Sequence, residues 1–168
     1  MKLLVTKLWF PYNVRTTLAG LFEIPQIQER FDEGFLYDGE MRPQDIKVCS
    51  GYWPANAVLD RLPESKKDVY LVLTSMDLKG DYGRIHGKGY NRKAIASNNS
   101  FLSGAKNNIF DPRDIDFQAM TFHELGHALG LSHHDNDSLN HCAMPLGSHS
   151  WSSLDKIRFC DECYNKIK

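Results

Sequence analysis

Runs of apolar residues in the first hundred positions predict strands. Four such runs stand out: Lys2–Trp9, Ile46–Trp53, Val69–Met76 and Lys93–Ser97. Val69–Met76 is almost continuously apolar, which is typical of a strand buried on both faces. Gly80–Asn91 is rich in glycine and polar residues and suits a loop or an edge strand. Asp32–Asp45 is ambiguous, and a hairpin is one interpretation of it.

Two segments between these runs show helical spacing. Apolar residues recur at this spacing from Val14 to Phe22, which predicts an amphipathic helix that stops near Pro25 or continues to about Arg30. Ala55–Leu62 predicts a shorter helix. Because strands and helices alternate along the chain, we expect an α/β (α+β) fold with a mixed, mainly parallel sheet packed by helices.

A further helix is predicted to begin at residue 111. Asp111 suits an N-cap, Pro112 suits the first helical position, and Gly130 is a natural stop. The apolar face of this helix carries Phe122, Leu125 and Leu129, and the opposing face carries Asp116, Met120, His123 and His127.

Length and charge exclude several classes of protein. The chain has 168 residues, enough for one domain with a single core. Its formal net charge is −1, so it has no bulk attraction to nucleic acid or to an anionic membrane. The longest apolar stretch, Leu3–Phe10, is too short for a membrane span or a signal peptide. We therefore expect a cytoplasmic protein with no nucleic-acid or membrane partner, and we assume a monomer.

Histidine and cysteine gather near the C-terminal end of the sequence. Six of the 7 histidines and three of the 4 cysteines come after residue 120. Imidazole and thiolate are the ligands that zinc prefers. The chemistry of the chain is therefore expected in this region.

Residues 123–133 read HELGHALGLSH and contain a candidate zinc site. His123 and His127 lie one helical turn apart and can bind one zinc ion together. Gly130 permits a sharp turn, after which His133 can return as a third nitrogen ligand. Three protein ligands leave a fourth position open for water, as in a catalytic zinc site, and Glu124 can reach that water without binding the metal. The alternative is that these histidines are surface or core residues with no metal.

The pattern HExxHxxGxxH is the signature of the metzincin metalloproteases, and HELGHALGLSH is similar to the matrixin version. Cys142-x-Met144 followed by Cys160-x-x-Cys163 resembles the archaemetzincins more closely. The resemblance implies a zincin fold, with an upper subdomain (1–130) that contains the active-site helix and a small lower subdomain (131–168) with a Met-turn at Met144. It also implies hydrolysis of a peptide or protein substrate by a zinc-activated water, with Glu124 as the general base.

The resemblance also implies a second, structural zinc ion on the cysteines. In archaemetzincins a cysteine directly follows the third histidine of the motif, whereas this chain has His134 there. The expected ligands are therefore His134, Cys142, Cys160 and Cys163, with His141 as the alternative to His134. One disulfide plus a free thiol is the alternative for the cysteines.

Three functions remain open from the sequence. The first is a zinc metallopeptidase, and the second is a catalytically silent zinc-containing module that binds peptides. The third is a zinc hydrolase that acts on a non-peptide amide. Glu124 argues against the silent module, because a binding protein needs no general base. The resemblance further implies that substrate lies extended along an edge strand near Gly83–Asn91.

Overall fold

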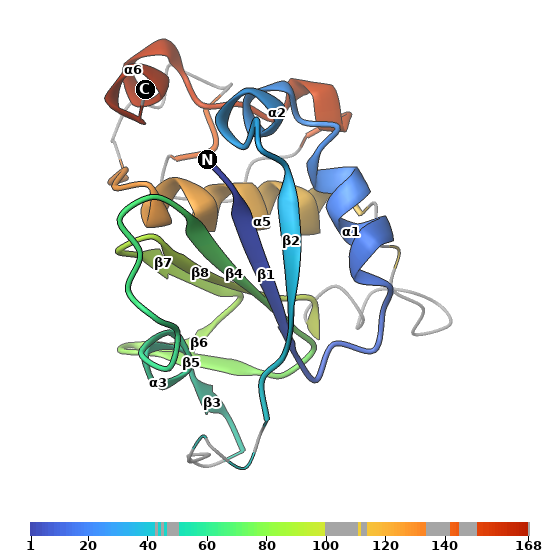
Figure 1. Cartoon of the computed structure of the whole chain (residues 1–168), viewed down its shortest axis with the longest axis vertical. Helices are drawn as coiled ribbons and strands as arrows, with labels where there is room; N and C mark the ends of the chain where they lie inside the picture. Colours follow the sequence, from blue (N-terminus) through green and yellow to red (C-terminus); the bar gives the residue numbers. More distant parts are fainter. Residues whose placement is uncertain are drawn as a thin grey trace.

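A five-stranded sheet organises the fold in a computed structural model of the chain (Figure 1). The structure describes residues 1–42, 44, 46, 51–99, 111, 114–133, 142–144 and 151–167. The strand order is β2 (Phe35–Glu40), β1 (Leu3–Leu8), β4 (Val69–Thr74), β8 (Lys93–Ser97) and β7 (Gly87–Tyr90). The first four strands are parallel, and β7 is antiparallel to β8. The prediction of a mixed, mainly parallel sheet is confirmed.

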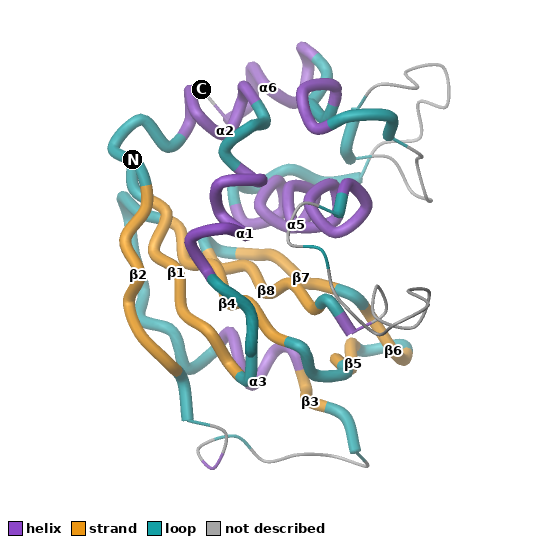
Figure 2. Tube along the Cα trace, turned by 90° about the vertical axis from the view of Figure 1, so that its right-hand side faces the viewer, coloured by secondary structure: helices purple, strands orange, loops and turns teal. Residues whose placement is uncertain are grey.

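Helices cover both faces of this sheet (Figure 2). One face is covered by α1 (Val14–Leu21) and α5 (Ile115–Ala128). The other face packs against α3 (Ala55–Leu59) and a three-stranded sheet of β3 (Trp53–Pro54), β5 (Leu78–Gly80) and β6 (Gly83–Ile85). Beyond α5, away from the sheet, lie α2 (Pro25–Arg30), the 3₁₀ helix η2 (Leu154–Lys156) and α6 (Asp161–Ile167). Among the helices of the described residues, none has the length and apolar character needed to cross a membrane.

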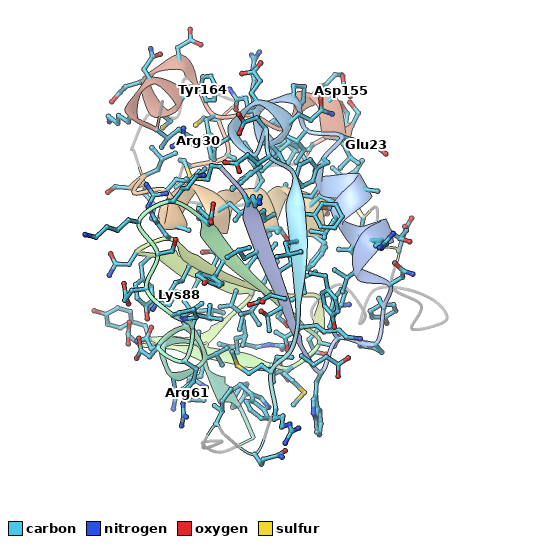
Figure 3. The ribbon with its side chains drawn as sticks, viewed as in Figure 1. Glu23, Arg30, Arg61, Lys88, Asp155 and Tyr164 are labelled. Atoms are coloured by element: carbon cyan, nitrogen blue, oxygen red, sulfur yellow. The ribbon has the colours of Figure 1, made fainter. Side chains whose placement is uncertain are left out.

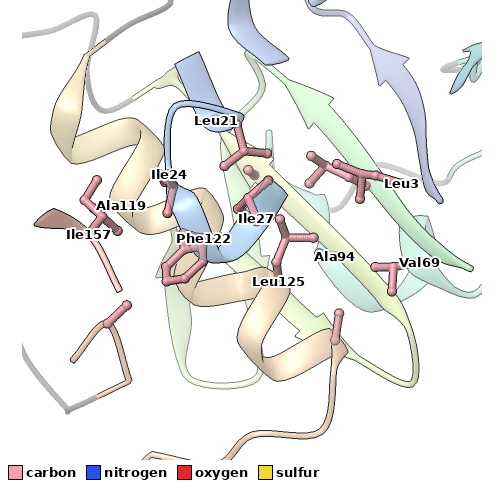
Figure 4. Close-up of a cluster of buried hydrophobic side chains, with 14 of the residues drawn as sticks. Leu3, Leu21, Ile24, Ile27, Val69, Ala94, Ala119, Phe122, Leu125 and Ile157 are labelled. Atoms are coloured by element: carbon pink, nitrogen blue, oxygen red, sulfur yellow. The ribbon is translucent and has the colours of Figure 1, made fainter. Parts of the chain in front are cut away.

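The alternation of side chains along the strands creates two hydrophobic clusters. In β1, Leu3 and Val5 belong to the cluster under α5, whereas Leu8 belongs to the cluster around α3. In β4, Leu71 and Val72 divide in the same way, so this strand is buried on both faces, as its apolar run predicts. The cluster under α5 is shown in Figure 4, where Phe122 and Leu125 of α5 lie close to Ile24 and Ile27.

The start of α5 differs from the prediction. The N-cap is Asp114, whose carboxylate accepts a hydrogen bond from the Phe117 N–H at 2.9 Å. Asp111 lies one turn earlier, and its carbonyl accepts from the Asp114 N–H at 2.9 Å. The prediction of Asp111 as the cap is therefore wrong. Aspartate is favoured at both positions, so residue type alone does not choose between them.

Two predictions for the segment before β4 also need correction. The described part of Asp32–Asp45 contains a single strand, β2, which pairs in parallel with β1 and forms no hairpin. The predicted helix from Val14 is divided into α1 and α2, and Pro25 is the first residue of α2 because it needs no N–H partner there. Most of Ile46–Trp53 lies outside the described residues.

The segment after α5 is held against α2. The side-chain amide of Gln26 donates to the Phe159 carbonyl at 3.1 Å and accepts from the Phe159 N–H at 2.6 Å. Tyr164 of α6, labelled in Figure 3, donates to the Glu29 carboxylate. The C-terminal residues therefore cover the side of α5 that faces away from the sheet. The boundary between subdomains at residue 130 stays a prediction.

Candidate metal centres and active site

Three imidazoles converge at the C-terminal end of α5. His123 and His127 lie one turn apart on the helix, and Gly130, with φ of 96°, ends it and turns the chain so that His133 comes back toward them. The three Nε2 atoms lie 3.1 Å from one another. Tetrahedral zinc with Zn–N distances of about 2.0–2.1 Å needs nitrogen atoms about 3.3 Å apart. The spacing of the three nitrogens therefore fits one zinc ion.

The hydrogen bonds of two rings define which nitrogen faces the centre. His123 Nδ1 lies 2.5 Å from the Ala143 carbonyl oxygen, and His127 Nδ1 lies 2.8 Å from the Leu131 carbonyl oxygen. A carbonyl oxygen only accepts, so in the neutral rings each Nδ1 carries the proton. Each Nε2 then presents a lone pair to the centre. Lone pairs at this separation repel one another unless a cation lies between them, so the donor set also fits a metal ion.

Glu124 is a buried carboxyl group next to the first of these histidines. It is 8% exposed, and its Oε2 atom has no hydrogen-bond partner within the described part of the chain. Burial raises the pKa of Glu124 to about 8, and the positive charge of Lys88 on β7 acts in the opposite direction. A carboxyl group with a pKa near neutrality suits proton transfer.

In the metal-free protein, Glu124 is expected to make stability fall as pH rises. Its pKa in the folded chain, about 8, lies above its ordinary value of 4.5. Between these two values the unfolded chain releases a proton that the folded chain retains, so the contribution is complete below the lower value and is lost as pH rises through the higher one. Glu124→Gln should remove this part of the pH dependence, measured by urea unfolding of the chelated protein between about pH 5 and pH 8.

Asp116→Asn is the matched control for this measurement. Asp116 lies on the same helix and is exposed, so its variant removes a carboxylate of α5 that is not buried. Equal slopes for the wild type and Glu124→Gln would contradict the predicted role of burial at Glu124.

Met144 packs directly beneath α5. Its side chain is fully buried, and a Cβ placed on Gly126 would lie only 2.5 Å from the Met144 sulfur and 2.9 Å from the Phe159 ring. The absence of a side chain at Gly126 therefore allows Met144 to approach the HELGH helix closely. The Met-turn itself stays a prediction, because residues 145–150 lie outside the described ones.

Three cysteines form a second group of candidate metal ligands. The Sγ atoms of Cys142, Cys160 and Cys163 lie within 4.8 Å of one another, and those of Cys142 and Cys163 are 3.9 Å apart. None of the three forms a disulfide, so the disulfide alternative is not observed. Tetrahedral zinc with Zn–S distances of about 2.3 Å needs sulfur atoms about 3.8 Å apart. The predicted fourth ligand, His134, and its alternative, His141, lie outside the described residues.

Burial and hydrogen bonds shift the pKa values of the three thiols in different directions. Burial raises the pKa of Cys142 and of Cys163. Burial acts in the same direction on Cys160, but hydrogen bonds from the Cys163 N–H and from the two neighbouring thiols outweigh it and lower the pKa of Cys160. The Cys160 N–H in turn donates to Cys142 Sγ at 3.2 Å. Because metals bind thiolate, Cys160 is the thiol most ready to supply it.

Comparison with solved structures identifies the fold. The archaemetzincin from Methanopyrus kandleri matches with a TM-score of 0.71 and 23% identity over 99% of this chain and 93% of that chain. The archaemetzincin from Archaeoglobus fulgidus, solved in complex with malonate, gives 0.69 and 24% over 99% and 100%. This chain has the archaemetzincin fold. A zinc-dependent peptidase from Methanocorpusculum labreanum (strain Z) gives 0.65 and 19% over 98% and 100%. No protein-family model and no curated protein matches the chain.

The archaemetzincin fold brings together the predicted residues that the structure describes. His123, His127 and His133 form one group, and the three cysteines after residue 140 form the other. Their roles as ligands remain predictions. Sequence reasoning missed the carbonyl groups of Ala143 and Leu131, because main-chain atoms have no residue-type signal. It also missed the positive charge of Lys88, which lowers the pKa of Glu124 from a strand 36 positions earlier in the chain.

Proposed function

We propose that this chain is a zinc-dependent metallopeptidase of the archaemetzincin type. The observation that carries the proposal is the convergence of three imidazole nitrogens, 3.1 Å apart, beside the buried carboxyl group of Glu124. His123, His127 and His133 would hold the catalytic zinc ion. When bound, this ion supplies a Lewis acid for a water molecule and for the carbonyl oxygen of a peptide bond.

Side chains and main-chain groups of the protein transfer the protons and orient the histidine rings. Glu124 accepts a proton from the attacking water and passes it to the leaving amine nitrogen. Its burial raises its pKa and therefore its affinity for a proton. The Ala143 and Leu131 carbonyl groups hold the rings of His123 and His127 by their Nδ1–H groups, so that both Nε2 atoms face the centre.

The edge of the sheet supplies a place for substrate. β7 is the last strand in the order, and no described strand pairs with its outer side. An extended peptide would add there as a further strand, with main-chain hydrogen bonds giving affinity and little demand on side-chain identity. The peptide bond to be cut would then lie next to Glu124, because β7 packs on the helix at that residue.

The cysteine group serves a structural role in this proposal. Cys142, Cys160 and Cys163 would hold a second zinc ion, with His134 as the fourth ligand and His141 as its alternative. This ion would fasten the lower subdomain, residues 131–168, under the active-site helix of the upper subdomain, residues 1–130. A small lobe with little core of its own gains most from such a metal.

The test is cleavage of a diverse peptide library by the wild-type protein. The protein is assayed as purified, after removal of metal by a chelator, and after addition of zinc or, as the control, magnesium. We expect cleavage that disappears with the chelator and returns with zinc only. A folded, zinc-loaded protein that cuts no peptide would overturn the proposal, and peptide-binding measurements on it would then test the silent binding module.

A further inference from the structure

Two glycines of β7 face the active-site helix. The strand reads GKGY, and side chains alternate between faces along it. Lys88 and Tyr90 point to the side of α3 and β5, where they bond to Asp81 and Asp60 at 2.9 Å and 2.8 Å. Gly87 and Gly89 therefore occupy the face that lies on α5. Their partners on β8, Ala96 and Ala94, are small and fully buried.

Because Gly87 and Gly89 have no side chains, β7 can touch α5 at Glu124. A Cβ on Gly89 would overlap the main-chain carbonyl of Glu124 and lie 3.0 Å from the Ala128 nitrogen. A Cβ on Gly87 would lie 2.5 Å from Glu124 Cγ and 2.9 Å from the Met120 sulfur. Gly89 thus sets the distance between backbones, whereas Gly87 contacts the side chain of Glu124 itself.

The turn after β7 fixes this strand against α5. The turn that leads from β7 to β8 contains Asn91 and Arg92, both at positive φ (49° and 61°), as in the two-residue turns that suit the twist of hairpins. The Arg92 N–H donates to the Ala128 carbonyl at 2.8 Å, at the C-terminal end of α5. The hairpin is therefore tied to the same end of the helix that presents the histidines.

We propose that Gly87 is a positioning residue for Glu124, an inference that rests on the proposed peptidase function. The Oε2 atom of Glu124 has no hydrogen-bond partner among the described residues, so packing around Cγ contributes to the placement of the carboxylate. Gly87 forms one wall of that space and Met120 another. In this proposal the contact limits where the Glu124 side chain can lie and directs its carboxylate toward the histidines.

Gly87→Ala tests this inference, with Gly80→Ala as the matched control. The Gly80 variant also adds one methyl group to a strand, but its Cβ would meet only the flexible Ile85 side chain, at 3.0 Å. We expect Gly87→Ala to lower kcat at least tenfold with KM and zinc affinity unchanged, and Gly80→Ala to leave all three unchanged. Adding Met120→Ala to Gly87→Ala should restore part of kcat, because Glu124 then has room to move. A purely structural role of Gly87 would instead lower zinc affinity in parallel with kcat.

A second readout needs no turnover and so separates this inference from the proposed function. In metal-free protein labelled with ¹³C at the glutamate carboxyl groups, Glu124→Gln identifies the Glu124 resonance by its absence. Gly87→Ala should shift that resonance, and Gly80→Ala should not. The Gly87 Cβ would also lie 2.8 Å from the Ile95 carbonyl oxygen, so if that variant does not fold, Met120→Ala alone tests the other wall and should shift the resonance. An unmoved resonance, or loss of zinc affinity in parallel with kcat, would overturn the inference.

Discussion

Replacing Glu124 with glutamine is expected to lower kcat by about 10²–10⁴-fold, the range that positioned acid–base groups contribute. Glutamine has the same shape as glutamate, so the packing against Gly87 and Met120 is kept. It cannot accept a proton from water, so the step that depends on the carboxylate is lost. Zinc content and KM should stay at wild-type values, because Glu124 neither binds the metal nor holds the substrate in this proposal. Steady-state kinetics on one peptide from the library, with zinc counted per chain, measures all three quantities.

Asp116→Asn is the control for this variant as well. It removes one carboxylate from the same helix, two turns earlier and exposed to solvent, and should leave kcat unchanged. Peptide cleavage at the wild-type rate by Glu124→Gln, with zinc present, would contradict the assignment of the general base. Equal losses in the Glu124 and Asp116 variants would instead indicate an effect of net charge on the helix.

The grouping of the histidines beside Glu124 could be predicted because it is almost local in the sequence. His123, Glu124 and His127 lie within five positions, so helical geometry alone places them together. Gly130 indicates the turn that brings His133 back toward the helix, and the structure shows the positive φ that such a turn requires. Residue types and spacing were enough for this part of the site.

The remaining features depend on tertiary contacts that no local pattern carries. The packing of Gly87 on Glu124 joins a strand to a helix 37 positions later in the chain. In the sequence, the same glycine reads only as a sign of a loop or an edge strand. The parallel pairing of β2 with β1 was missed for the same reason, because the exposed residues of an edge strand show no alternation.

Removing Cys163 is expected to cost the protein one zinc ion and much of its thermal stability. Cys163 is 3% exposed in α6 and lies 3.9 Å, sulfur to sulfur, from Cys142. We expect Cys163→Ala to lower Tm by roughly 10 °C, since each kcal/mol shifts Tm by about 2–4 °C in a domain of this size and a structural zinc ion supplies several. Metal analysis and thermal unfolding check both effects. Cys49→Ala, outside the motif, is the matched control and should keep the full zinc count.

A chelator separates loss of metal from loss of packing at Cys163. The Tm difference between wild type and Cys163→Ala should shrink in metal-free buffer, because only the wild type then loses an ion from the cysteine group. A difference that stays the same with and without chelator would show that the alanine acts through packing alone. Full zinc content in Cys163→Ala would contradict the second site itself.

The Cys163 variant should also weaken zinc binding at the histidines, because residues 142–144 connect the two centres. Cys142 belongs to the cysteine group, the Ala143 carbonyl accepts from His123 Nδ1, and Met144 packs under Gly126. The Ala143 N–H is bonded to the Arg158 carbonyl at 2.8 Å, so this segment is tied to the chain that leads to Cys160. If Cys142 is no longer held by a metal ion, the Ala143 carbonyl that orients His123 becomes less fixed. Loss of such an orienting partner typically lowers metal affinity by about 10–100-fold. Competition with a zinc chelator measures this loss, and an unchanged affinity at the histidines would mean that the two centres are independent.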